Sequence, residues 1–121
     1  MDGASAREVR IGVVGPCGAG KSTLVAGLSN AGWKCSHIAQ EHSYVPHMWQ
    51  RIAAPDYLIF LQASFATCTH RRRLNWQEQD YAEQMRRLAH ALQHADLLIE
   101  TDKLTPEQVL SRAREFLEGI A

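Results

Sequence analysis

The sequence has no excess of charge of either sign, because 13 lysines and arginines balance 13 aspartates and glutamates. A neutral chain has no global electrostatic field to attract a polyanion, which disfavours nucleic acid as a partner. No apolar run approaches the length of about 18 residues that suggests a transmembrane helix, so we expect no membrane span. The polar segment 1–8 does not have the pattern of a signal peptide.

Cysteine is scarce as well. Cys17, Cys35 and Cys68 are odd in number and lack C-x-x-C spacing, which predicts reduced thiols in a cytoplasmic protein. Histidines are present, but His90 and His94, although four apart, lack the glutamate of an H-E-x-x-H metal motif and are expected on a solvated helical face.

The most informative segment fits G-x-x-x-x-G-K-[ST], the phosphate-binding loop or Walker A motif. It lies between a β-branched run at 9–14, which predicts a buried strand, and an apolar periodicity at 21–30, which predicts a helix. Glycines let successive amides point at an anion, and the helix dipole adds to the attraction. The nucleotide-binding residues predicted here are Gly15, Pro16, Cys17, Gly18, Ala19, Gly20, Lys21, Ser22 and Thr23.

Within this motif each polar side chain has an expected role. Lys21 would contact the β- and γ-phosphates, Ser22 would bind Mg²⁺, and Thr23 would face the α-phosphate. Cys17 could also be a thiol whose oxidation or alkylation blocks ligand binding.

The rest of the chain alternates strand patterns with helix patterns. We expect further strands at 33–40, 56–62 and 96–100, a helical turn or two after Pro46, and helices at 65–74, 75–95 and from 106 onward. Such alternation indicates parallel β-α-β units. The expected fold is a three-layer α/β/α domain at 9–121, with about four parallel strands, after a loose tail at 1–8.

Capping residues mark the helix boundaries. Gly32 predicts the end of the first helix, and Ser64 and Thr105 predict N-caps. Asn75 and Glu78 have the spacing of a capping box. The helix that follows is expected to bury a stripe formed by Tyr81, Met85, Leu88 and Leu92.

The chain resembles the kinase-like branch of the P-loop NTPases. Besides the loop motif, segment 55–61 followed by the triplet 71–73 is similar to the strand, helix and arginine-bearing lid of thymidylate and deoxynucleoside kinases. Segment 95–109 resembles the last strand and helix of thymidylate and adenylylsulfate kinases. The resemblance implies a minimal P-loop kinase core that binds Mg·ATP and transfers the γ-phosphoryl group to a small acceptor or to water.

The same resemblance implies roles for residues outside the loop. Arg72 would stabilise the transition state and Arg73 would contact nucleotide, with stacking on the base as an alternative for one arginine of the triplet. Thr101 and Asp102 would lie under the adenine. The absence of an N-K-x-D motif favours ATP over GTP.

The chain also departs from those kinases. It is shorter between residue 30 and Pro55, where they carry an acceptor-binding insertion and a strand with an acidic magnesium ligand, and Gln62 ends a strand where NTPases often have Asp. Glu41 is therefore the expected Mg²⁺ ligand or general base, provided that its strand neighbours the first one. The alternative is an exposed loop acid. His42 beside it could transfer protons.

Two other functions remain open. The short segment 41–54 favours a nucleotide-binding module with negligible turnover that acts through a partner. A homo-oligomer or a partner protein would then supply the missing acceptor site. The loop could instead hold the phosphates of single-stranded nucleic acid, which the neutral charge disfavours.

Overall fold

The chain folds around a four-stranded, all-parallel sheet with the strand order β2-β1-β3-β4. The computed structural model describes residues 9–72 and 75–120, so the expected tail at 1–8 and Arg73 lie outside the described residues. The elements are β1 (Arg10–Val14), α2 (Lys21–Asn30), β2 (Lys34–His37), the 3₁₀ helix η1 (Gln40–His42), α3 (Met48–Ile52), β3 (Tyr57–Gln62), α4 (Phe65–Arg72), α5 (Glu78–Arg87), α6 (Ala89–His94), β4 (Leu97–Glu100) and α7 (Pro106–Ile120).

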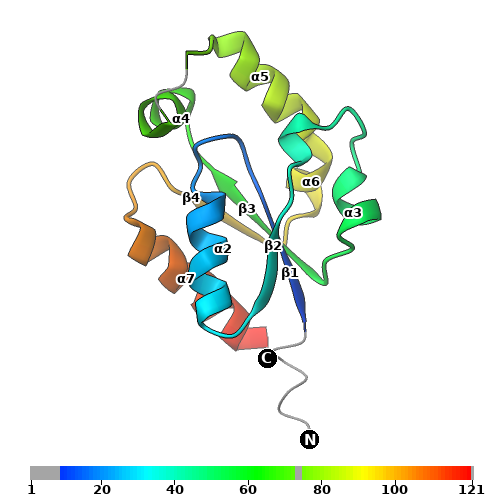
Figure 1. Ribbon diagram of the computed structural model, residues 1–121, viewed down its shortest axis with the longest axis vertical. Coiled ribbons are helices and arrows are strands. Elements are labelled where there is room, and N and C mark those ends of the chain that lie inside the picture. Colours follow the sequence, from blue (N-terminus) through cyan, green and yellow to red (C-terminus); the bar gives the residue numbers. More distant parts are fainter. Residues whose placement is uncertain (1–8, 73–74, 121) are drawn as a thin grey trace, which may run out of the picture.

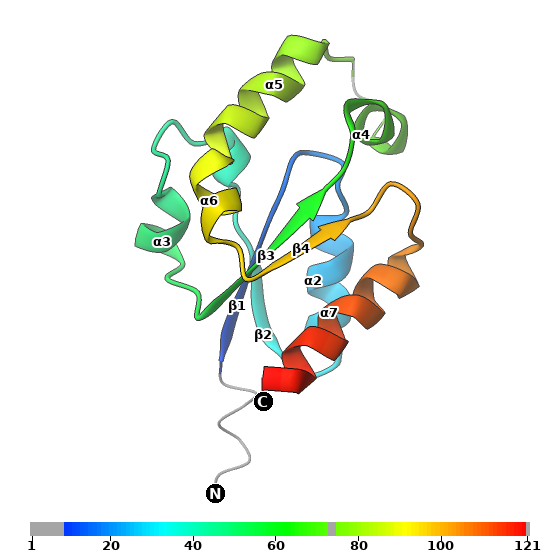
Figure 2. The same cartoon turned by 180° about the vertical axis from the view of Figure 1, so that it is seen from behind.

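Helices cover both faces of the sheet. Successive side chains of β3 point to opposite faces, so Ile59 and Leu61 join one buried cluster while Leu58 and Phe60 join another. The first cluster is completed by α2 and α7, and the second by α3, α6 and part of α5. Figures 1 and 2 show these two groups of helices on either side of the strands. The expected mixed α/β architecture with four parallel strands is confirmed.

Local signals account for most of the boundaries. Helix α2 stops where Gly32 takes a φ of 95°, and the amide of Trp33 reaches back to the carbonyl of Leu28. Ser64 Oγ accepts from the amide of Thr67, and Thr105 Oγ1 accepts from that of Gln108, so both expected caps are confirmed.

The expected helix at 75–95 differs in two ways. Its capping box lies two residues later than predicted, between Gln77 and Asp80 rather than Asn75 and Glu78. It also breaks at Leu88, whose amide is shared between two carbonyls of the preceding turn and whose side chain is fully buried. After this break, Leu92 lies on the exposed side, so its predicted place in the core was wrong.

In the ranges 9–72 and 75–120, no helix combines the length and the apolar character needed to cross a membrane.

Candidate functional site

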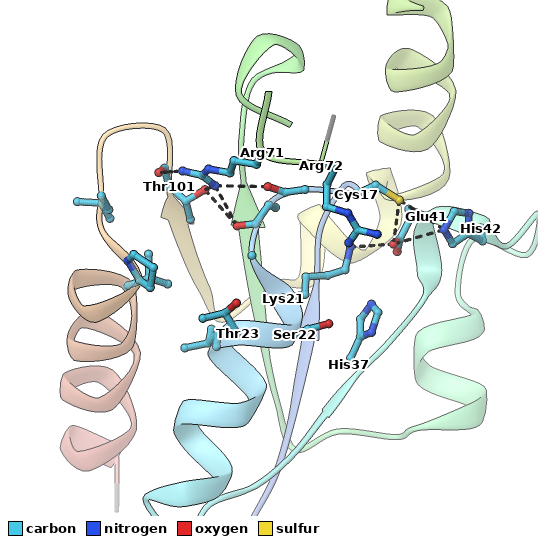
Figure 3. A pocket seen from close by; sticks show the side chains of 17 residues that line it. Cys17, Lys21, Ser22, Thr23, His37, Glu41, His42, Arg71, Arg72 and Thr101 are labelled. Carbon is cyan, nitrogen blue, oxygen red and sulfur yellow. Dashed lines mark hydrogen bonds and ion pairs between the residues drawn. The ribbon is translucent and has the colours of Figure 1, made fainter. Parts of the chain in front are cut away.

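The carboxyl ends of the strands surround a cavity of about 440 Å³. In parallel sheets this edge is where ligands bind, because the loops after neighbouring strands meet there. Figure 3 shows the cavity with its lining side chains. The predicted residues on its wall are Cys17, Gly18, Ala19, Gly20, Lys21, Ser22, Thr23, Glu41, Arg72 and Thr101.

The glycine-rich loop, residues 15–20, joins β1 to α2. Gly18 has a φ of 89°, and a Cβ there would lie 2.7 Å from the carbonyl oxygen of Cys68, so backbone packs directly against backbone. Gly20 has a φ of 103° in open space. Both conformations are ones that L-residues with side chains rarely adopt, which explains the glycines at these positions.

The loop and the first turn of α2 present free amide donors. Among the described residues, no protein acceptor takes the backbone N–H of Gly18, Gly20, Lys21, Ser22 or Thr23, and all five residues line the cavity. The amides at the start of a helix have no intrahelical partner, and the dipole makes that end attractive to anions. This part of the cavity wall therefore has the chemistry of an anion site.

Two loop amides are already occupied, that of Ala19 by the carbonyl of Pro16 and that of Cys17 by a side chain. The N–H of Cys17 donates to Oε1 of Gln84 at 3.0 Å, and Nε2 of Gln84 donates to Sγ of Cys17 at 3.3 Å. Gln84 belongs to α5 and is largely buried, so α5 is held against the glycine-rich loop by two side-chain hydrogen bonds.

Lys21 is folded back onto the loop. Its Nζ donates to the carbonyls of Gly15 and of Pro16, the latter at 3.1 Å, and to Oε2 of Glu41 at 2.7 Å. Gly15 and Pro16 thus hold the ammonium group and are not on the cavity wall. The lysine is 6% exposed and the glutamate 2% exposed, so this is a buried ion pair.

Glu41 lies in η1, directly after β2, and β2 pairs with β1. The condition that the sequence analysis set for Glu41 is therefore met, and the alternative of an exposed loop acid was wrong. Its Oε1 is buried and has no hydrogen-bond partner among the described residues. A buried carboxylate oxygen without a partner is energetically costly, which marks this atom as a position for a cation or a donor.

Arg71 and Arg72 have different positions. Both line the cavity, but the guanidinium of Arg71 is engaged in supporting the loop: it donates to the hydroxyl and carbonyl oxygens of Thr101 and contacts the carbonyls of Gly18 and Ala19. Arg72 reaches the cavity wall from the last turn of α4. Arg73 lies outside the described residues.

Thr101 and Asp102 also occupy different positions relative to the cavity. Thr101 is buried, and its hydroxyl contacts the carbonyl of Ala19, so it belongs to the support of the loop. Asp102 is not on the cavity wall. Its carboxylate accepts from the amide of Ser64 at 2.9 Å, and this hydrogen bond holds the pKa of Asp102 below its usual range.

Part of the cavity wall was not predicted from the sequence. His37 ends β2 beside β1, so the rule that selected Glu41 would also have selected it. Desolvation and the charge of Lys21 lower the pKa of His37. Leu104, Pro106 and Val109 form an apolar wall at the start of α7, and their place after the last strand was the available signal.

Histidines elsewhere have a structural role. His90 accepts from Nε1 of Trp49 at 3.1 Å, and the rings of His90 and His94 lie 4.4 Å apart. The sequence had suggested a solvated helical face for His90, but its ring packs against the indole of Trp49. Gln62, at the end of β3, is not on the cavity wall.

Neither protein-family models nor curated protein sequences give a significant match to the chain. The geometry of the cavity is therefore what supports a function.

Proposed function

We propose that the chain is a Mg·ATP-binding protein of the kinase-like branch of the P-loop NTPases. The observation that carries this proposal is the ring of free amides at residues 18 and 20–23, next to the buried ammonium of Lys21. A polyphosphate would accept hydrogen bonds from these amides and draw Lys21 away from Glu41. A cavity of about 440 Å³ falls in the range of small-molecule sites.

The wall chemistry assigns parts of the ligand. Ser22 would contribute its hydroxyl to Mg²⁺, and Glu41 would bind that ion or accept the acceptor's proton. Arg72 would neutralise charge on the phosphates. The apolar wall formed by Leu104, Pro106 and Val109 would contact the base.

Calorimetry tests the proposal. Replacing Lys21 by methionine removes a charged hydrogen bond worth about 1.5–3 kcal/mol, so MgATP affinity should fall roughly 10- to 150-fold. Ser22→Ala should weaken binding of MgATP and leave binding of ATP in EDTA unchanged. Ser29→Ala, at the far end of the same helix, is the matched control.

Folding must be separated from binding in these variants, because Lys21 is buried. Circular dichroism and thermal unfolding show whether Lys21→Met is folded, and Ser22 is exposed, so its variant should fold normally. Equal ATP affinity in the folded Lys21→Met variant and in the parent would refute the proposal.

A second candidate is a nucleotide-binding module with negligible turnover that acts through a partner. The segment between β2 and β3 holds only η1 and the five-residue α3, and it leaves Tyr44 83% and Ile52 77% exposed. Phosphate release, measured with and without nucleoside and metabolite acceptors, separates the two functions. If turnover exists and Glu41→Gln does not change it, Glu41 has no role in the reaction.

A further inference from the structure

Three side chains with metal-binding atoms converge on the side of the Lys21–Glu41 ion pair that faces α5. Cys17, Glu41 and His42 place one ligand atom each within 4.8 Å of the others, and no other such group occurs in the described ranges. Sγ of Cys17 lies 3.5 Å from Nε2 of His42 and 3.8 Å from Oε2 of Glu41. The same Nε2 and Oε2 are 3.7 Å apart. Figure 3 shows the three side chains pointing toward one another.

These separations suit a single tetrahedral ion. Zinc bonds of about 2.3 Å to sulfur and about 2.0 Å to nitrogen or oxygen place ligand atoms about 3.5 Å apart when sulfur is involved and about 3.3 Å apart otherwise. The observed distances come within about half an ångström of these values. One ion can therefore reach all three atoms with small side-chain movements.

A second, independent observation concerns Glu41. Its carboxylate is 2% exposed and one of its oxygens, Oε1, has no partner among the described residues. Lys21 satisfies only one of the two oxygens, at 2.7 Å. The oxygen that lies near Cys17 and His42 is Oε2, the one that Lys21 holds. The carboxylate must therefore either share Oε2 between Lys21 and the ion or turn so that the unpartnered Oε1 faces the ion.

The charge of Lys21 opposes a second cation nearby, but the ligands change charge on binding. The Sγ–H bond of Cys17 breaks, its proton goes to solvent, and the sulfur–metal bond forms, which adds one negative charge. His42 binds through Nε2 in its neutral form. Cys17 and Glu41 then supply two negative charges against the two of the ion and the one of Lys21, which leaves a single net positive charge at the site.

We propose that Cys17, Glu41 and His42 bind a divalent transition metal of the zinc class. A thiolate and an imidazole select such an ion over Mg²⁺, which prefers oxygen ligands. Three protein ligands leave a fourth position open, on a wall that the three residues share with the cavity. The side chain of His42 is 59% exposed, which gives the ion a path from solvent.

The competing explanation is a network of ordinary polar contacts. Sγ of Cys17 already accepts from Gln84, and it lies near enough to Glu41 and His42 for weak hydrogen bonds. Such a network needs no metal and gives no thiolate.

Cobalt titration of the untagged, EDTA-treated, reduced full chain distinguishes the two. Co²⁺ bound by Cys17 should give a sulfur-to-metal charge-transfer band at one ion per chain, and Zn²⁺ should displace it. Cys17→Ser should abolish the band, while Cys35→Ser, whose thiol lies on β2 near α2, should keep it. Cys68 is buried, and burial raises the pKa of its thiol to about 11.

Zn²⁺ affinity, measured against a competing chelator, supplies the second readout. His42→Ala should lower it at least tenfold, and His70→Ala, at an exposed position of α4, should not. No charge-transfer band, a band that survives Cys17→Ser, or equal Zn²⁺ affinity in His42→Ala and the parent would overturn the proposal.

The experiments distinguish a failure of the metal proposal from a failure of the nucleotide proposal. The titration uses no nucleotide, so its failure leaves ATP binding untouched. In Lys21→Met the competing ammonium is gone, so Zn²⁺ should bind more tightly while ATP binds more weakly. Weaker Zn²⁺ binding in the folded variant would contradict the metal site alone.

Discussion

The ammonium of Lys21 and the carboxylate of Glu41 lie 2.7 Å apart, and water reaches almost none of either side chain. Removing one member of such a pair leaves an uncompensated buried charge. The two residues come from different segments, the start of α2 and η1, so their contact holds the glycine-rich loop to the end of β2.

The first prediction concerns this ion pair. Lys21→Met or Glu41→Leu alone should each lower the free energy of unfolding by about 3–5 kcal/mol, and the double variant should lose less than the sum. The exposed pair Arg114–Glu118, 3.4 Å apart, is the control and should contribute less than about 1 kcal/mol. Urea unfolding measures all variants, and additive losses at Lys21 and Glu41 would contradict the expected coupling.

The second prediction compares two glycines of the loop. Gly20→Ala places a methyl group in open space and should cost about 1–2 kcal/mol, from its positive φ alone. Gly18→Ala adds a clash with the backbone at Cys68 and should cost at least about 3 kcal/mol. Gly119→Ala, in open space on α7, should not destabilise. Thermal unfolding ranks the stabilities of the three variants. Equal stability losses at Gly18 and Gly20 would contradict the prediction, because they would show that the loop moves away from Cys68 without an energetic cost.

The third prediction concerns His37. Desolvation, Lys21 and His42 lower the pKa of this imidazole, and Glu41 raises it. Lys21→Met removes a positive charge and should therefore raise the pKa of His37, whereas the remote Arg112→Met should not. The Hε1 shift of His37, followed by NMR against pH, measures this. If MgATP binds as proposed, the phosphate charge should raise the pKa of His37 in the parent as well.

The fourth prediction concerns acid stability. The pKa of Asp102 is lowered by the amide of Ser64, so its contribution to stability is full above its ordinary pKa and is lost as the pH falls through the lower, folded value. Asp102→Asn should therefore lose less stability than the parent on acidification. Glu107→Gln, at an exposed site, should follow the parent. Urea unfolding at several acidic pH values tests this, and an unchanged acid dependence in Asp102→Asn would contradict it.

Local patterns predicted what local interactions determine. The strand, loop and helix around residues 10–30 follow from spacing and glycines, and the Ser64 and Thr105 caps from neighbouring side chains. The capping box near residue 77 failed because two overlapping registers both offered a polar cap and an acid three residues later. The break at Leu88 has no glycine or proline to mark it, and it coincides with the burial of the Leu88 side chain in the cluster against the sheet.

The candidate site likewise has residues that the sequence could predict and residues that depend on tertiary packing. Its loop could be read from the motif, and Glu41 could be placed because strand ends of parallel sheets converge. The different contacts of Arg71 and Arg72, which both line the cavity, could not be predicted, because adjacent side chains on a helix point in different directions and only the tertiary packing decides which one binds the loop. The pairing of Lys21 with Glu41 likewise depends on the neighbourhood of β1 and β2.

The hydrogen bond from Cys17 to Gln84 has a consequence for how occupancy is felt elsewhere. The N–H of Cys17 cannot donate strongly to two acceptors at once, so a ligand oxygen that accepts it must displace Oε1 of Gln84. Helix α5 would then lose a tether to the loop. For a ligand that takes this N–H, binding and release of α5 would be thermodynamically linked, and a partner that binds the released helix would in turn raise the affinity for that ligand.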